Sequence, residues 1–239
     1  MTAKSMADML GEALQSVDWT ANIDAFVNQG VLLKAVAKEN MRLAVWSRQL
    51  ENADSANPAL CFIREMQVAG HHVAALTALC IYKAAGAAMR TMWDTALYYS
   101  YFRTHPVELG TQANNPRFYV EKREIIEFHK NHTPEFDLLQ QRLGLLTRLE
   151  KWYSFTSAVI HGQVPGTWVE HTAIGEICYS ETTASSVVEN FAEGVDLVHR
   201  LFLCTVARAL WDDFSSTAKK QLLSGLSADI KIALRLDNA

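Results

Sequence analysis

Apolar residues recur at helical spacing along almost the whole chain, which predicts an all-α fold. We expect a first helix over residues 4–15 and a second over residues 19–50, which Gly30 interrupts. A polar stretch ending at Asn57 follows, and Asn57 caps a further helix that begins at Pro58. The N-terminal quarter of the chain is therefore predicted to be helical throughout.

The central part of the chain carries the longest apolar pattern. Residues 58–103 contain no proline after the first position, which indicates either one long helix or two helices in tandem, with bends at Gly70 or Gly86. The alanine-rich run 84–88 would let another helix approach closely. The element ends before Pro106, because a proline pushes the residue before it out of the α region.

The pattern stays helical toward the C-terminus, apart from one insertion. In order, it predicts a loop at 111–116, helices over 117–130 and 135–160, an irregular segment or short β-hairpin near 163–180, a helix from Thr182 or Thr183 to Phe214, and a final helix over 216–236. We expect one domain over residues 1–239, a helix bundle with long central helices. Its parts are N-terminal helices (1–57), a core (58–162), the insertion (163–181) and C-terminal helices (182–239).

Charge limits the kinds of partner. The net charge is −4, and lysine and arginine alternate with aspartate and glutamate along the chain. A surface that follows nucleic-acid phosphates normally shows as a basic domain or stripe. We therefore expect no DNA binding, although a small local basic site for RNA stays open.

The cysteines and the hydropathy pattern indicate a cytoplasmic chain. Cys61, Cys80, Cys178 and Cys204 lie far apart among apolar neighbours and form no C-x-x-C pair, which is typical of core residues in a reducing compartment. The most apolar stretch contains two histidines and is too short to span a bilayer. We expect no membrane partner.

Several motifs are absent, which narrows the chemistry. The chain has no phosphate loop, no dinucleotide-binding turn, no nucleophile elbow and no zinc helix, and it lacks the paired Glu-x-x-His motifs of di-iron bundles. His129 and His132 with Glu135 form the one arrangement that resembles a metal site. A histidine near a helix C-terminus interacts well with the helix dipole, so we favour that interpretation and expect no metal and no cofactor.

Two segments carry the candidate chemistry. In residues 153–162 an apolar helix ends in His161, which we expect at the last turn with one side open to a cleft. On the central helix, Arg90 and Asp94 are four positions apart and share a helix face within an apolar run. A charged pair in such a run is expected to be partnered when it is buried.

These segments resemble the HEPN superfamily, most closely its poorly characterised bacterial branches. Those branches combine an Arg-x-x-x-acid element on an inner helix with a late Tyr-x-x-x-Ser-x-x-x-His-Gly element. The matching residues are Arg90, Asp94, Tyr153, Ser157, His161 and Gly162, within a resemblance that covers residues 75–166. It implies a dimer-forming helical bundle from bacterial and archaeal conflict systems. The resemblance also implies a candidate activity, because the active members of the superfamily are metal-independent ribonucleases with an Arg-x(4–6)-His motif near the dimer interface.

The chain departs from the family pattern at the catalytic arginine. In the family's chemistry the histidine acts as general acid or base, and the arginine stabilises charge on the phosphate. Here Thr156 stands five positions before His161, and the nearby basic residues on that helix are Arg148 and Lys151. An Arg-x5-His spacing does occur at residues 123–129, but glutamates crowd it.

Three functions remain open at this stage. The leading hypothesis is a HEPN-like binding or assembly component of a bacterial antiviral defence or toxin–antitoxin system, homodimeric or with a protein partner. The second is a ribonuclease toxin in which His161 works with Arg90 or Arg148. The third is a bundle that binds a small ligand in an apolar cavity near Trp93 and Trp152.

The site residues follow from these hypotheses. His161, Arg90 and Asp94 form the candidate catalytic set, and the candidate binding residues are Tyr153, Ser157, Tyr98 and Arg148. The alternative for His161 is a helix-end residue bonded to a buried partner such as Asp94 or a tyrosine. The alternative for Arg90 and Asp94 is a buried ion pair that fixes helix register.

Overall fold

The computed structural model describes residues 4–169 and 171–236, and all the regular structure in these ranges is helical. The α-helices are α1 (Met6–Ser16), α2 (Trp19–Asn28), α3 (Gly30–Ala53), α4 (Leu60–Ala78), α5 (Tyr82–Phe102), α6 (Pro106–Asn114), α7 (Lys122–His132), α8 (Phe136–Leu143), α9 (Leu145–Ile160), α10 (Glu181–Cys204), α11 (Ala207–Leu210), α12 (Ser216–Leu223) and α13 (Ala228–Leu234). Two 3₁₀ turns, η1 (Ile174–Glu176) and η2 (Trp211–Asp213), complete the fold. The predicted all-α helix bundle is confirmed.

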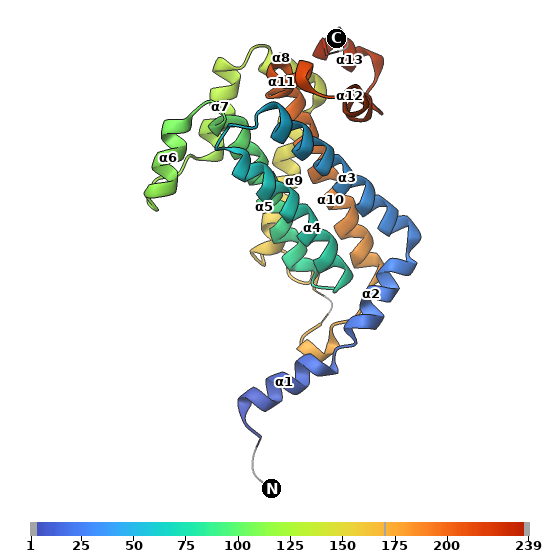
Figure 1. Ribbon diagram of the computed structural model, residues 1–239. Coiled ribbons are helices and arrows are strands. Elements are labelled where there is room, and N and C mark those ends of the chain that lie inside the picture. Colours follow the sequence, from blue (N-terminus) through green and yellow to red (C-terminus); the bar gives the residue numbers. More distant parts are fainter. Residues whose placement is uncertain (1–3, 170, 237–239) are drawn as a thin grey trace.

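The long helices α3, α4, α5, α9 and α10 form the body of the bundle (Figure 1). Helix α5 is central, because it packs against α4, α9 and α10. Its Trp93, like Trp46 of α3 and Phe191 of α10, is fully buried in a single hydrophobic cluster that extends from Phe26 to Leu236. Burial of such large side chains is the main source of stability in a fold of this size.

The central segment forms two helices that fold back on each other, and the break is at neither predicted glycine. Helices α4 and α5 are joined by residues 79–81, with Cys80 in the left-handed region at φ 60°. The backbone N–H of Ile81 donates to the Leu76 carbonyl at 2.8 Å, which closes the end of α4 as a left-handed cap. A cysteine in this position gives no turn signal, so the sequence did not locate the break.

Gly86 lies inside α5 and allows the close approach that the alanine-rich run predicts. A Cβ atom there would lie 3.0 Å from the Trp168 ring and 3.2 Å from the Ile160 side chain. Ile160 is the last residue of α9, so Gly86 brings the end of α9 against α5.

Other boundaries differ from the prediction in the same region. Helix α6 begins at Pro106 and extends to Asn114, so the loop predicted at 111–116 is largely helical. The helix predicted over 135–160 is divided into α8 and α9 by Gly144, whose φ of 62° cannot continue an α-helix. This break turns α9 so that it packs along α5 and α10.

The C-terminal helices are shorter than predicted. Helix α10 is capped by the Ser180 hydroxyl rather than by Thr182 or Thr183, and it ends at Cys204. The predicted final helix is divided into α12 and α13, separated by residues 224–227. Gly225, at φ 81°, lies in this gap.

The insertion is irregular, and the β-hairpin alternative is wrong for its described residues, 163–169 and 171–180. Its only regular piece in those ranges is η1. Trp168 fixes the segment to the bundle, because its ring is buried and its indole N–H donates to the Ser186 hydroxyl at 3.1 Å.

Helix α1 is set apart from the body of the bundle (Figure 1). It buries none of its side chains and packs against η1. Its apolar residues Met6, Met9, Leu10 and Leu14 are exposed. The bundle's core therefore begins with α2 rather than with the first predicted helix.

Candidate functional site

The candidate site lies along the contact between α5 and α9. Tyr153, Ser157 and His161 follow one another at four-residue intervals, so they share a side of α9 and its C-terminal cap. Arg90 and Asp94 lie on the side of α5 that faces α9. The two sequence motifs, more than fifty residues apart, are thus brought together by helix packing.

Arg90 is held by two hydroxyl groups. Its two terminal nitrogens donate to the Ser157 hydroxyl and to the Tyr153 hydroxyl. Its guanidinium carbon also lies 3.4 Å from the centre of the Tyr153 ring, a cation–π arrangement. The Ser157 hydroxyl in turn donates to the Tyr153 carbonyl at 2.6 Å. Both principal partners of this arginine are uncharged.

The ion pair expected between Arg90 and Asp94 is present but loose. The nearest nitrogen and oxygen are 3.8 Å apart, beyond hydrogen-bonding distance. Burial raises the pKa of the Asp94 carboxyl, while the positive charges of Arg90 and Lys122 lower it by less. Asp94 therefore compensates the arginine charge only in part.

Lys122 is a site residue that the sequence analysis missed. It is the first residue of α7, and its ammonium group lies over the Tyr153 ring without an ion pair to any of the described residues. The pKa of Lys122 is lowered to about 8, chiefly by burial; the Asp94 charge opposes this effect, and the Arg90 charge adds a smaller one in the same direction as burial. An isolated lysine near a helix start gives no sequence signal, because only the docking of α7 against α5 brings it to the site.

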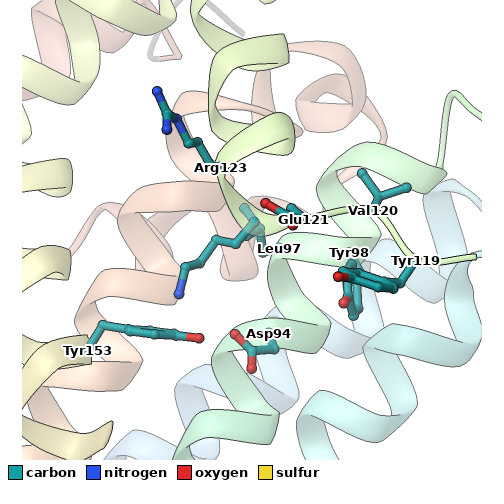
Figure 2. A pocket seen from close by; sticks show the side chains of 9 residues that line it. Asp94, Leu97, Tyr98, Tyr119, Val120, Glu121, Arg123 and Tyr153 are labelled. Carbon is teal, nitrogen blue, oxygen red and sulfur yellow. The ribbon is translucent and has the colours of Figure 1, made fainter.

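A cavity of about 390 Å³ opens beside these residues (Figure 2). Its lining includes Asp94, Tyr98, Tyr119, Lys122 and Tyr153. The Tyr153 hydroxyl and the Asp94 carboxylate point toward each other, as Figure 2 shows, and burial raises the pKa of both the Tyr98 and the Tyr153 phenol. Tyr98, a predicted binding residue, thus lies at the cavity as an uncharged hydrogen-bonding group.

His161 occupies the C-terminal cap of α9, where its side chain is exposed. Among the described residues no hydrogen bond, ion pair or ring contact involves that side chain, so the alternative of a bond to Asp94 or a tyrosine is not observed. The chain reverses at Gly162, with φ 69°, immediately after it. Lys83 of α5 is close to this turn, since its Nζ lies 3.5 Å from a Cβ built on Gly162.

Arg148 belongs to a different cluster and does not line the cavity. It donates to the two Glu193 oxygens at 2.8 and 2.5 Å and lies 2.8 Å from Asp196. These carboxylates raise its pKa. The partners come from α10, which the spacing within α9 could not reveal.

The histidines of α7 do not form a metal site. His129 is buried and hydrogen-bonds to the Ser100 hydroxyl at 2.9 Å and to the Thr133 hydroxyl at 2.8 Å, and burial lowers its pKa to about 4. Across residues 4–169 and 171–236 no three histidine, cysteine, aspartate or glutamate side chains are grouped to hold a metal ion. In the same ranges, none of the helices is long and apolar enough to cross a bilayer.

Comparison of the chain with protein-family models, with curated proteins and with solved structures gives no match. The resemblance to the HEPN superfamily therefore stays a prediction that rests on the residues of the α5–α9 site.

Proposed function

We propose that this chain is a HEPN-like binding component in which the α5–α9 site holds an anionic group of a ligand. The observation that carries the proposal is the surplus of positive charge at the site. Arg90 is bonded to two neutral hydroxyls, and Lys122 is bonded to no carboxylate of the described residues. Two acids line the cavity, Asp94 and Glu121, and neither hydrogen-bonds to these cations. Partly desolvated cations of this kind form strong hydrogen bonds with phosphate or carboxylate groups.

Two features favour binding over RNA cleavage. None of the three positions at which the family's catalytic arginine could stand is basic, since they hold Ser154, Phe155 and Thr156. Thr156 is fully buried and is bonded to the Trp152 carbonyl and the Asn190 amide. A side chain at this position faces the core, so it cannot reach a phosphate at the surface. His161 has no observed partner that would orient its ring, which a general base normally requires.

The biological setting follows from the resemblance alone, which is an associational argument. It gives a homodimer, or an assembly with a second protein, within a bacterial antiviral defence or toxin–antitoxin system; the proposed cytoplasmic location comes instead from the cysteines and the hydropathy pattern. The proposed assembly is tested by light scattering of the purified chain, where a mass twice that of the 26.7 kDa monomer is expected. A monomer at all concentrations that co-purifies with no protein would contradict the assembly role.

The binding proposal is tested by calorimetric titration with methyl phosphate. We expect saturable binding by the wild-type chain, and a loss of affinity of about 100-fold in Arg90→Met, since charged hydrogen bonds are worth about 1.5–3 kcal/mol each. Arg148→Met is the matched control, because Arg148 is already paired with Glu193 and Asp196. Equal affinities for the three proteins, or no binding by any of them, would contradict the proposal.

A second candidate function, the metal-independent ribonuclease toxin, is favoured by one observation. Two cations lie along the contact between α5 and α9, near His161. Lys83 is close to the turn at Gly162, and Arg90 is bonded to Ser157, so both would be available to bind a phosphate. The test is cleavage of end-labelled total tRNA in EDTA by the wild-type chain and by His161→Ala. Cleavage by the wild type alone would make this the leading function, whereas equal or absent cleavage would remove it.

The third hypothesis, a bundle that binds a small ligand, needs a different position for that ligand. Trp93 and Trp152 are packed in the core, so a ligand would contact the tyrosines of the neighbouring cavity instead. Small-ligand binding is thus retained within the proposed function as a property of the polar site.

A further inference from the structure

A second cavity adjoins the first on the other side of Lys122. It has a volume of about 580 Å³ and lies between α7 and α9. Its floor is apolar, formed by Ile126, Leu146 and Leu149. Helix α7 packs against α5 and α8, and α9 packs against α5, α8 and α10, so the surfaces that α7 and α9 turn toward each other leave this groove open.

The groove has a cationic rim. Lys122, Arg123 and Lys130 line it together with one acid, Glu150. Lys130 is paired with Glu127 at 2.8 Å, whereas Lys122 and Arg123 form no ion pair with any of the described residues. An apolar floor with unpaired cations at its edge complements a molecule that has an apolar body and an anionic end.

The two cavities share Lys122, Arg123 and Tyr153. In Figure 2 the Arg123 side chain extends away from Asp94 and Tyr153. An anionic group placed at Lys122 would therefore have the Asp94 and tyrosine cavity on one side and the apolar groove on the other. Lys122, which lines both cavities, determines where the charged end of a ligand lies, and the groove determines the direction of its apolar part.

We propose that the groove between α7 and α9 binds the apolar part of an amphipathic organic anion, with its phosphate or carboxylate at Lys122. The inference rests on the proposed function and adds the chemical class of its ligand. A purely polar anion would leave the Ile126, Leu146 and Leu149 surface uncovered, whereas an alkyl or other apolar chain of several carbons would cover it.

The test is a chain-length series in calorimetry, with methyl, butyl and octyl phosphate below micelle-forming concentrations. Each fully buried methylene strengthens binding about fourfold, so even partial burial should make octyl phosphate at least about 30-fold tighter than methyl phosphate. Leu146→Asn should remove this gain and leave methyl phosphate binding unchanged. The matched control is Leu138→Asn, an exposed leucine of α8 that does not line the groove.

The outcomes separate the two proposals. If methyl phosphate binds and the affinity is flat along the series, the groove proposal is overturned and the proposed function stands. If no member of the series binds, both fail. Octyl phosphate binding that persists in Lys122→Met would overturn the placement of the anionic end.

A measurement on the wild-type chain covers the case in which Leu146→Asn does not fold. Hydrogen exchange with octyl phosphate should show new protection in residues 122–130 and 146–154, the two sides of the groove. Protection confined to α1, whose Met6 and Met9 are exposed, would mean that the alkyl chain binds elsewhere and would overturn the proposal.

Discussion

Two arginines on neighbouring faces of the bundle, Arg90 and Arg148, show how the same side chain serves different purposes. Arg148 is bonded through its Nε and one terminal nitrogen to carboxylates, at 2.5 and 2.8 Å from Glu193 and at 2.8 Å from Asp196. Arg90 is bonded to the hydroxyls of Tyr153 and Ser157, and its nearest carboxylate oxygen is 3.8 Å away. The positive charge of Arg148 is therefore neutralised by carboxylates, whereas that of Arg90 is largely uncompensated.

The Arg148 centre is a closed network. Asp196 also lies 2.6 Å from Arg200 and 3.5 Å from Arg42, so three arginines converge on one carboxylate. Burial raises the pKa of Asp196, but Arg200 and Arg148 outweigh it and hold that pKa below its usual value. Such a network joins α3, α9 and α10 and leaves no group for a ligand.

The Arg90 centre has the opposite balance. Burial raises the pKa of Asp94 and lowers that of Lys122, which means that both groups lack full compensation for their charge. Charged groups held in this state at a cavity are common at functional sites. The comparison indicates that partner chemistry, rather than the presence of an arginine, distinguishes a ligand site from a structural one.

The largest expected effect is a difference in methyl phosphate affinity between variants of the two arginines. Arg90→Met and Arg148→Met remove the same charge from neighbouring centres. We expect methyl phosphate affinity to fall about 100-fold in the first and by less than about twofold in the second, by titration calorimetry. A similar loss in both variants would show that general charge, not the α5–α9 site, attracts the anion.

A pair of aspartate variants tests the closed network. Asp196→Asn leaves three arginines facing one neutral amide, so we expect the free energy of unfolding to fall by about 2 kcal/mol, less than for a fully buried pair because the carboxylate is partly exposed. Asp94→Asn should change it by less than about 0.5 kcal/mol, since burial already disfavours that charge. Urea unfolding at pH 7 measures both.

The stabilising contribution of Asp196 depends on pH. Its pKa is lower in the folded chain, so its contribution is present above the unfolded-state pKa of about 3.9 and is lost as pH falls through the folded value. The difference between wild type and Asp196→Asn should therefore disappear only in strong acid. A difference that disappears near neutral pH would assign the effect to another group.

The sequence predicted the fold class and one of these two centres. Periodicity indicated the helices, and the four-residue spacings of Arg90 with Asp94 and of Tyr153 with Ser157 indicated which side chains share a helix face. The structure places these motifs against each other. Spacing within one helix carries no information on partners from another, so the Glu193 and Asp196 bonds of Arg148 could not be predicted.

The remaining differences have specific physical causes. Cys80 adopts a left-handed conformation without the glycine or asparagine that normally signals it, which hid the turn between α4 and α5. Lys122 joins the site only through the docking of α7. Gly144 did carry a turn signal, but the strong apolar pattern on both sides of it favoured one continuous helix.

A smaller effect concerns the protonation of Lys122. The groups that face its ammonium are Arg90, Asp94 and Tyr98 of α5 and Tyr153 of α9, with Glu121 and Arg123 beside it in the chain. Its pKa is about 8, and an anion binds the protonated form, so affinity for methyl phosphate should be highest near pH 7 and about tenfold weaker at pH 9. Monophosphate esters are mostly dianionic between pH 7 and pH 9, because their second pKa is about 6, so the ionisation of the ligand does not cause this decrease.

The matched measurement uses Lys122→Met at pH 7 and pH 9. This variant should bind weakly at both values, without the decrease seen in the wild type. A wild-type profile that stays flat to pH 9 would show that Lys122 does not contact the anion, and the binding site would then be confined to Arg90.

The smallest expected effect belongs to His161, the third member of the predicted catalytic set. Its side chain is exposed and forms no hydrogen bond, ion pair or ring contact with the other described residues, so His161→Ala should change the free energy of unfolding by less than about 0.5 kcal/mol. Methyl phosphate affinity should also stay within about twofold, because the charges at the site come from Arg90 and Lys122. Urea unfolding and calorimetry on the same preparation give both values. A large loss of affinity in a variant that keeps its stability would place the imidazole on the ligand, and would restore His161 to the site in which Arg90 already lies.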